Sequence, residues 1–123
     1  MDKQIRVLLA DDTPDIRRLT RMMLDLDDRF VVVGEAADGV EAVEMAASQR
    51  PDAIILDIAM PVMDGLDAIP LILERAPGTR IVVLSAYPEQ ASREALARGA
   101  HAWVDKGSDF EELTDKLMET LTA

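Results

Sequence analysis

The chain lacks cysteine, has a single histidine, and is poor in basic residues. The absence of cysteine excludes disulfides, thiolate metal sites and cysteine nucleophiles. Lysine and arginine number 13 against 24 aspartates and glutamates, so the formal net charge is −11. A polyanion of this kind is repelled by DNA phosphates, so we expect no direct nucleic-acid binding. No apolar stretch approaches the roughly 20 residues that span a bilayer, and we expect no membrane partner.

The length and composition suit one globular domain. The 123 residues, 49% of them hydrophobic, can bury a core but are too few for two independent cores. We therefore predict one domain over residues 1–123. The first apolar run, Ile5–Ala10, carries Arg6 and is too short for a signal peptide, so we expect a mature cytoplasmic chain.

Short apolar runs alternate with segments of helical spacing. The runs are continuous and rich in valine, isoleucine and leucine, which is typical of parallel strands covered on both faces. The predicted strands are Ile5–Ala10, Phe30–Ala36, Ala53–Leu56, Ile81–Leu84 and Ala102–Val104.

Capping residues mark helices between these runs. Thr13-Pro14, Asp38, Pro88 and the capping box from Ser108 to Glu111 predict four helix starts. The predicted helices end near Leu26, Gln49, Arg75, Gly99 and Leu121. Pro70 lies inside the third helix, from about Leu66, and predicts a kink or a later start there. A βα unit repeated five times predicts a doubly wound α/β domain with right-handed crossovers.

Polar side chains follow four of the predicted strands. Asp11 and Asp12 follow the first strand, Asp57 the third and Ser85 the fourth, and the fifth leads into Lys106. The second strand ends in Glu35-Ala36-Ala37, with no matching polar residue. Because ligands of open α/β sheets bind outside the carboxyl ends of the strands, these side chains should meet at one rim.

This combination favours a metal-assisted phosphoryl site. Three carboxylates in one crevice repel one another unless a cation is present. Their oxygens are hard ligands without histidine or cysteine nearby, so Mg²⁺ is the expected ion. A metal beside Lys106 and Ser85 suits a phosphoryl group, because cations neutralise charge on the transferring oxygens. Asp57 is central and is the expected nucleophile, forming an aspartyl phosphate.

Four motifs in this order resemble the receiver domain of bacterial two-component response regulators, over essentially the whole chain. They are Asp11-Asp12, Asp57-Ile-Ala-Met-Pro-Val-Met-Asp-Gly65, Val83-Leu84-Ser85-Ala86 and Gly99-Ala-His-Ala-Trp-Val-Asp-Lys106. The resemblance implies a flavodoxin-like three-layer sandwich with strand order 2-1-3-4-5. The Lys106-Gly-Ser ending is similar to the NarL/FixJ class, whose receivers precede a helix-turn-helix domain that regulates transcription. Such an output domain is absent from this chain.

The resemblance implies a phosphoacceptor and a metal site. Asp57 would accept phosphate from a sensor histidine kinase or a phosphotransfer protein. Asp12, Asp57 and the backbone carbonyl of Ala59 would bind Mg²⁺ directly, with Asp11 acting mainly through water. Ala59 and Tyr87 occupy positions that influence hydrolysis in the family, and neither is a good general base. We therefore expect no enzymatic turnover beyond self-phosphotransfer and slow self-dephosphorylation.

The resemblance also implies a switch. Lys106 would pair with the phosphoryl oxygens, Ser85 would move towards them, and Trp103 would be the aromatic that turns inward. The change would alter the face made by the fourth helix, fifth strand and fifth helix, and phosphorylation can bring two copies together. The alternative to control of transcription is a single-domain regulator or phosphorelay intermediate that acts by protein contact.

The first helix has a wide apolar face. Its apolar residues cover an arc of roughly 200° at 100° per residue, wider than a core stripe needs. We hypothesise that Ile16, Leu19 and Met22 contact the phosphodonor partner; a more deeply buried helix explains the pattern equally well. Other classes fit less well. A phosphatase with an aspartate nucleophile needs an acid where Thr13 stands. A flavodoxin needs a hydroxyl- and glycine-rich phosphate loop after the first strand, where Asp-Asp-Thr-Pro-Asp has the wrong charge.

Overall fold

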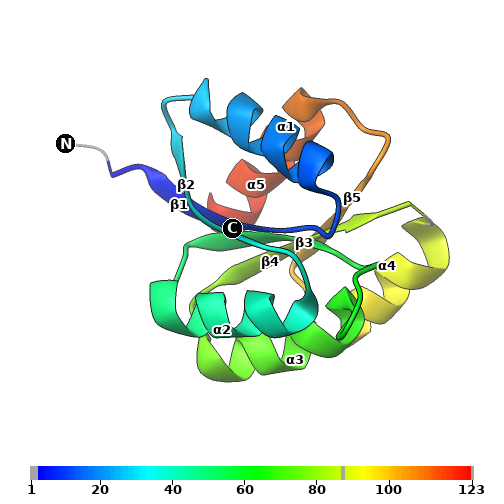
Figure 1. Ribbon diagram of the computed structural model, residues 1–123. Helices are drawn as coiled ribbons and strands as arrows, with labels where there is room; N and C mark the ends of the chain where they lie inside the picture. Colours follow the sequence, from blue (N-terminus) through cyan, green and yellow to red (C-terminus); the bar gives the residue numbers. More distant parts are fainter. Residues whose placement is uncertain (1–2, 87, 123) are drawn as a thin grey trace.

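Strands and helices alternate along the whole described part of the chain (Figure 1). The computed structural model describes residues 3–86 and 88–122. The strands are β1 (Ile5–Ala10), β2 (Phe30–Ala36), β3 (Ala53–Asp57), β4 (Arg80–Ser85) and β5 (Ala102–Asp105). The helices are α1 (Pro14–Asp25), α2 (Gly39–Gln49), α3 (Gly65–Arg75), α4 (Pro88–Ala97) and α5 (Phe110–Thr122).

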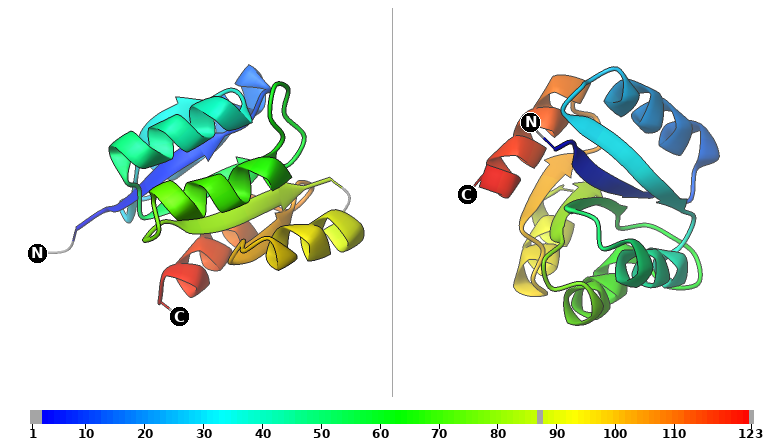
Figure 2. Two further views of the ribbon diagram at one scale, coloured as in Figure 1. Left: turned by 90° about the horizontal axis from the view of Figure 1, so that it is seen from below. Right: turned by 90° about the vertical axis from the view of Figure 1, so that its left-hand side faces the viewer.

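The five strands form one parallel sheet in the order β2-β1-β3-β4-β5. Helices α1 and α5 cover one face of the sheet, and α2, α3 and α4 cover the other (Figures 1 and 2). The fold is therefore the flavodoxin-like α/β sandwich that the sequence predicts. The strand order changes direction between β1 and β3, which places a crevice for ligands at the carboxyl ends of these two strands.

The core lies in two layers, one on each side of the sheet. Successive side chains of a strand point to opposite faces, so alternate residues of one strand enter different layers. Ile54 and Leu56 of β3 pack with the α2 and α3 side, whereas Ile55 packs with the α1 and α5 side. Every residue of β3 is buried. Burial on both faces explains why this strand is a continuous apolar run up to Leu56, whereas the buried carboxylate of Asp57 needs another reason.

The helix starts were predicted with mixed success. Asp38 accepts a backbone hydrogen bond from Glu41, as the predicted N-cap should, and Asp64 caps α3 in the same way by accepting from Asp67. Pro70 predicted a kink or a later start of the third helix. The later start is wrong, since α3 begins at Gly65 and contains Pro70, and the kink stays a prediction.

The predicted capping box at Ser108 is also wrong. The Asp109 carboxylate accepts from the N–H of Glu112 over 2.9 Å, and α5 begins at Phe110. The Ser108 N–H donates to the carbonyl of Asp105 instead, in the turn that follows β5. Ser108 therefore belongs to the turn, and Asp109 takes the capping position. Among the described helices, none is long and apolar enough to cross a membrane.

Candidate functional site

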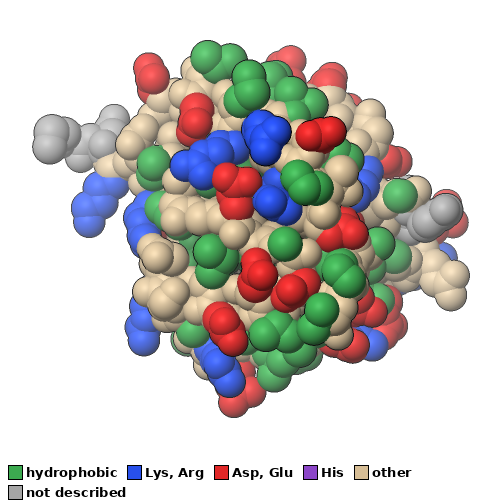
Figure 3. Space-filling model, in the orientation of Figure 1, with side chains coloured by type: hydrophobic (Ala, Val, Ile, Leu, Met, Phe, Trp, Pro, Cys, Tyr) green, Lys and Arg blue, Asp and Glu red, His purple; other side chains and the backbone are tan. Residues whose placement is uncertain are grey.

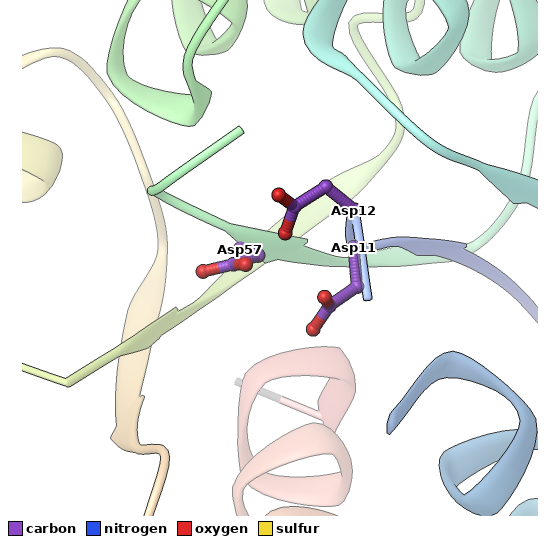
Figure 4. Close-up of side chains that lie close together, drawn as sticks. All are labelled: Asp11, Asp12 and Asp57. Carbon is purple, nitrogen blue, oxygen red and sulfur yellow. The ribbon is translucent and has the colours of Figure 1, made fainter. Parts of the chain in front are cut away.

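The carboxylates of Asp11, Asp12 and Asp57 meet at the carboxyl ends of β1 and β3 (Figure 4). Each offers an oxygen atom, and these oxygens lie within 4.8 Å of one another. Asp57 is 2% exposed and Asp11 4% exposed, whereas Asp12 is open to solvent. The predicted convergence of the three acids is confirmed, and the site opens outward on the side of Asp12.

Lys106 brings a positive charge to this cluster from the loop after β5. Its Nζ atom donates a hydrogen bond to Asp57 Oδ2 over 2.9 Å and lies 3.8 Å from Asp11 Oδ2. The Lys106 side chain is one-quarter exposed, so it reaches the buried carboxylates from the surface. One ammonium thus faces two buried carboxylates, which leaves the site with excess negative charge.

This charge balance is visible in the pKa values. Burial raises the pKa of Asp57 above its usual range, and the Asp11 charge raises it further. The hydrogen bond from Lys106 works in the opposite direction but does not cancel the effect of burial. Burial alone would lower the pKa of Lys106, yet its hydrogen bond to Asp57 and the charges of Asp57, Asp11 and Asp12 raise it. Lys106 is therefore held as a cation.

The oxygens of the site fit a hard divalent cation such as Mg²⁺. Asp11 Oδ1 accepts from the N–H of Thr13 over 2.8 Å, but the buried Asp11 Oδ2 has no hydrogen-bond partner among the residues that the structure describes. A buried carboxylate oxygen without a donor is costly, and a cation or its bound water satisfies it. The N–H of Ala59 donates to Asp57 Oδ1 over 3.3 Å, so the Ala59 backbone lies at the site. Ligation by its carbonyl stays a prediction.

Ser85 and Trp103 lie on the two strands nearest Lys106. Ser85 ends β4 and is buried, and its carbonyl accepts from the Lys106 N–H over 3.0 Å. Trp103 pairs with Val83 in the sheet and is 36% exposed beside α4 and α5. The structure thus links Ser85 directly to the Lys106 backbone and leaves the Trp103 side chain partly at the surface. Tyr87 lies outside the described residues.

The outer face of α1 carries an exposed apolar stripe. Ile16 is 41% exposed, and Leu19 and Met22 are each 59% exposed. Figure 3 shows hydrophobic side chains at the surface over this helix. Ile16 and Leu19 also line a groove of about 460 Å³ that reaches Phe110 and Lys106. The alternative of a deeply buried helix is therefore wrong, and the docking role of the stripe stays a prediction.

The sequence analysis missed Glu35, which it treated as an end of β2 without a matching polar role. Glu35 accepts from Arg17 Nε over 3.1 Å and from Arg21 Nη1 over 2.7 Å. The hydrogen bond from Arg21, followed by that from Arg17, lowers the pKa of Glu35 despite partial burial. Arg17 also donates from Nη1 to the carbonyl of Asp11 over 2.6 Å. Arginines four residues apart share one helix face, and this spacing could have indicated a common partner.

Sequence comparison decides the family. The profile described as "Response regulator receiver domain" matches residues 7–118. The chain belongs to the receiver domains of response regulators. The structure agrees: the chain resembles the response regulator domain of Thermotoga maritima CheB with a TM-score of 0.91 and 33% identity, covering 98% of both chains. It resembles the signal receiver domain of the Mycobacterium tuberculosis response regulator NarL with a TM-score of 0.93 and 32% identity, covering 99% of both.

A receiver of this kind also occurs within longer relatives. The chain is 42% identical over 127 residues to a protein-glutamate methylesterase/protein-glutamine glutaminase of Myxococcus xanthus, covering 97% of this chain and 36% of that protein. The chain spans about a third of the length of this and three further methylesterase relatives. Receiver membership together with the acidic cluster and Lys106 makes the chain a phosphoryl-accepting switch.

Proposed function

We propose that this receiver takes a phosphoryl group on Asp57 in a Mg²⁺-dependent reaction with a histidine kinase or phosphotransfer protein. The observation that carries the proposal is the position of Asp57: it is 2% exposed, hydrogen-bonded to Lys106, and grouped with Asp11 and Asp12. A nucleophile in such a place has a cation on one side and a metal-binding pair on the other.

The ligands we propose for Mg²⁺ are Asp12, Asp57 and the Ala59 carbonyl, with Asp11 acting through water. When bound, the ion supplies positive charge that offsets the phosphoryl and carboxylate oxygens. In the transfer, a carboxylate oxygen of Asp57 forms a bond to phosphorus while the N–P bond of the donor phosphohistidine breaks. The electron pair of the broken bond stays with the donor imidazole. Lys106 then pairs with the new phosphoryl oxygens.

The switch acts through Ser85, whose hydroxyl moves to the phosphoryl group, and Trp103, which turns inward beside it. A shift from a mostly inactive to a mostly active population needs a few kcal/mol of differential stabilisation. One or two charge-assisted hydrogen bonds, worth about 1.5–3 kcal/mol each, are of this order. The altered surface is the face of α4, β5 and α5. Since Trp103 is the single tryptophan, its fluorescence reports the change.

The phosphodonor docks on the apolar stripe of α1, defined by Ile16, Leu19 and Met22. Lys106, which contacts Asp57, also lines the groove beside Ile16 and Leu19, so a partner helix seated there lies near the acidic cluster. The phosphoryl group then leaves slowly, because Ala59 offers no side chain that could activate water. The chain has no enzymatic turnover of its own in this account.

Two classes of separate output module have support. A DNA-binding output of the NarL/FixJ class is favoured by the likeness to the NarL receiver and by 37% identity to a Bacillus subtilis transcriptional regulatory protein, YhcZ. A methylesterase output is favoured by the identity to the Myxococcus xanthus relative. A cytoplasmic regulator that acts as a receiver alone is the third form. The full coding length of the gene separates these cases.

The test uses acetyl phosphate as a small phosphodonor. With Mg²⁺, the wild-type protein should gain one phosphoryl group by intact mass, and Asp57→Asn should gain none. Asp28→Asn, which removes an exposed carboxylate from the loop before β2, should behave as wild type. Labelling of Asp57→Asn to the wild-type level would refute the proposal. Multiple turnover of the phosphodonor at a steady rate would favour a phosphatase instead.

A further inference from the structure

Arg17 of α1 connects the acidic cluster to the end of β2. Its Nη1 atom donates to the backbone carbonyl of Asp11 over 2.6 Å, and its Nε atom donates to Glu35 Oε1 over 3.1 Å. Arg21, one helical turn further on, donates to the other oxygen of Glu35 over 2.7 Å. Glu35 therefore binds both arginines, and of these two Arg17 also contacts the backbone of the acidic cluster.

We propose that Arg17 is a positioning residue of the acidic cluster, which orients Asp11 and Asp12 for the metal ion. The inference rests on the proposed Mg²⁺ site and adds a residue outside its ligand set. The carbonyl that Arg17 holds belongs to the peptide unit between Asp11 and Asp12. Because a peptide unit is planar, a hydrogen bond to this carbonyl restrains the plane of the peptide that joins the two residues.

The guanidinium group suits this role because both of its contacts are made by one rigid planar unit. Glu35 holds one edge of the group, and the Asp11 carbonyl receives Nη1. The Arg17 side chain is 18% exposed, so its place is also set by packing. A lysine has one ammonium on a flexible stem and cannot reproduce this fork. Because its pKa is lowered, Glu35 is ionised at neutral pH and keeps its hydrogen bond to Arg17 there.

Charge and position predict opposite effects on metal binding when Arg17 is removed. Arg17 is a cation near a site for a cation, so loss of its charge alone would tighten Mg²⁺ binding. Loss of the contact to the Asp11 carbonyl would loosen the Asp11-Asp12 segment and weaken binding. The sign of the change in Mg²⁺ affinity therefore shows whether Arg17 positions the acidic residues or acts only through its charge. This readout does not depend on phosphorylation.

The experiment compares Arg17→Met with Arg21→Met. Methionine keeps an apolar stem of similar length and removes the donors. Both changes remove one positive charge from α1 and one hydrogen bond from Glu35, but only Arg17→Met removes the contact to Asp11. Calorimetric titration with Mg²⁺ at about 0.15 M salt, where the Debye length is about 8 Å, measures the dissociation constants.

We expect Arg17→Met to bind Mg²⁺ about tenfold more weakly than wild type, the lower end of the range for residues that orient metal ligands. Arg21→Met should bind as wild type or slightly more tightly. The backbone amide of Asp12 should shift in the NMR spectrum of Arg17→Met before any metal is added, and not in that of Arg21→Met. If Arg17→Met does not fold, Arg17→Lys replaces it, with a loss of about threefold because lysine keeps one contact of the two.

Two results would overturn the inference. Arg17→Met that binds Mg²⁺ as tightly as wild type, or more tightly, would make Arg17 a bystander charge. Equal weakening in both methionine variants would assign the effect to the attachment of α1, and not to the contact with Asp11. Failure of the metal site itself is distinguishable. In that case wild type would either bind no Mg²⁺ or bind it as tightly as Asp12→Asn does, and the proposed function would be refuted together with this role of Arg17.

Discussion

Lys106 Nζ donates to Asp57 Oδ2 over 2.9 Å and so joins the ends of β5 and β3 across the intervening strand β4. Even with this cation in place, burial keeps the pKa of Asp57 above its usual range. The acceptor carboxylate is thus held in a site that penalises its charge. The pKa of Asp57 and the stability of the fold should therefore both respond to changes at Lys106 and Asp57.

Replacement of Lys106 by methionine should raise the pKa of Asp57 further. Burial and the charge of Asp11 would remain, while the hydrogen bond and the positive charge of Lys106, which lower this pKa, would be lost. The backbone hydrogen bond from Ala59 would stay in both proteins. Carboxyl ¹³C NMR over a pH titration measures the change. Lys116→Met, which removes an ammonium that pairs with Glu119 on the surface of α5, is the control and should leave the Asp57 pKa unchanged. A fall in the Asp57 pKa in Lys106→Met would contradict the role of Lys106.

Asp57→Asn should be more stable to unfolding than wild type at pH 7 without metal. The ionised Asp57 is disfavoured in the fold because its pKa is raised, so removal of the charge should gain ~1 kcal/mol, the scale of one close like-charge contact in water. The advantage should shrink as the pH falls through the raised pKa of folded Asp57, since wild type then takes up a proton. It should vanish below about pH 3.9, the unfolded value. Urea unfolding at several pH values tests this; equal stability at pH 7 would count against it.

Gly65→Ala should destabilise the fold and disturb the acceptor. A Cβ atom on Gly65 would overlap the carbonyl oxygen of Asp57 and lie 2.8 Å from the Cα atom of Ile58, both backbone atoms that cannot move cheaply. Overpacking of this kind costs about 1–3 kcal/mol. Gly78→Ala is the matched control, because nothing lies within 4 Å of its added Cβ. The denaturant midpoints of the two variants measure the difference in stability. A Gly65→Ala protein as stable as Gly78→Ala would disprove the close approach of Gly65 to the backbone of Asp57 and Ile58.

Ile16→Asp should slow phosphoryl transfer from the partner kinase by at least tenfold and leave labelling by acetyl phosphate unchanged. The new charge would lie in the apolar stripe of α1, where a partner helix must be desolvated. Leu96→Asp on α4 introduces the same charge at a position of similar exposure, 44% against 41%, and should leave the transfer rate unchanged. A normal rate with the kinase in Ile16→Asp would show that the partner docks elsewhere.

The acidic cluster could be predicted from the sequence because its members depend only on the βα order. Once β1, β3 and β5 are recognised as parallel strands of one sheet, Asp11, Asp57 and Lys106 must follow at the same edge. The patterns of continuous apolar residues were strong enough to give the strands within one residue at each end. The burial of β3 on both faces could be predicted from its apolar composition alone.

The contacts of Arg17 and Glu35 could not be derived in this way. They depend on the rotation of α1 about its own axis and on the reach of two long side chains to the edge strand, which a periodic pattern does not specify. The cap of α5 failed for a similar reason. Ser108 and Asp109 are both good capping residues, and the turn that follows β5 decides between them by engaging the Ser108 N–H.

The most direct test of the account is to locate the covalent bond. After treatment with acetyl phosphate and Mg²⁺, borohydride reduces an aspartyl phosphate to homoserine, and mass spectrometry of the digested protein identifies the changed residue. The account predicts homoserine at position 57, dependent on Mg²⁺ and strongly reduced in Asp12→Asn. Homoserine at another aspartate, or modification at position 57 that is equal without the metal, would contradict it.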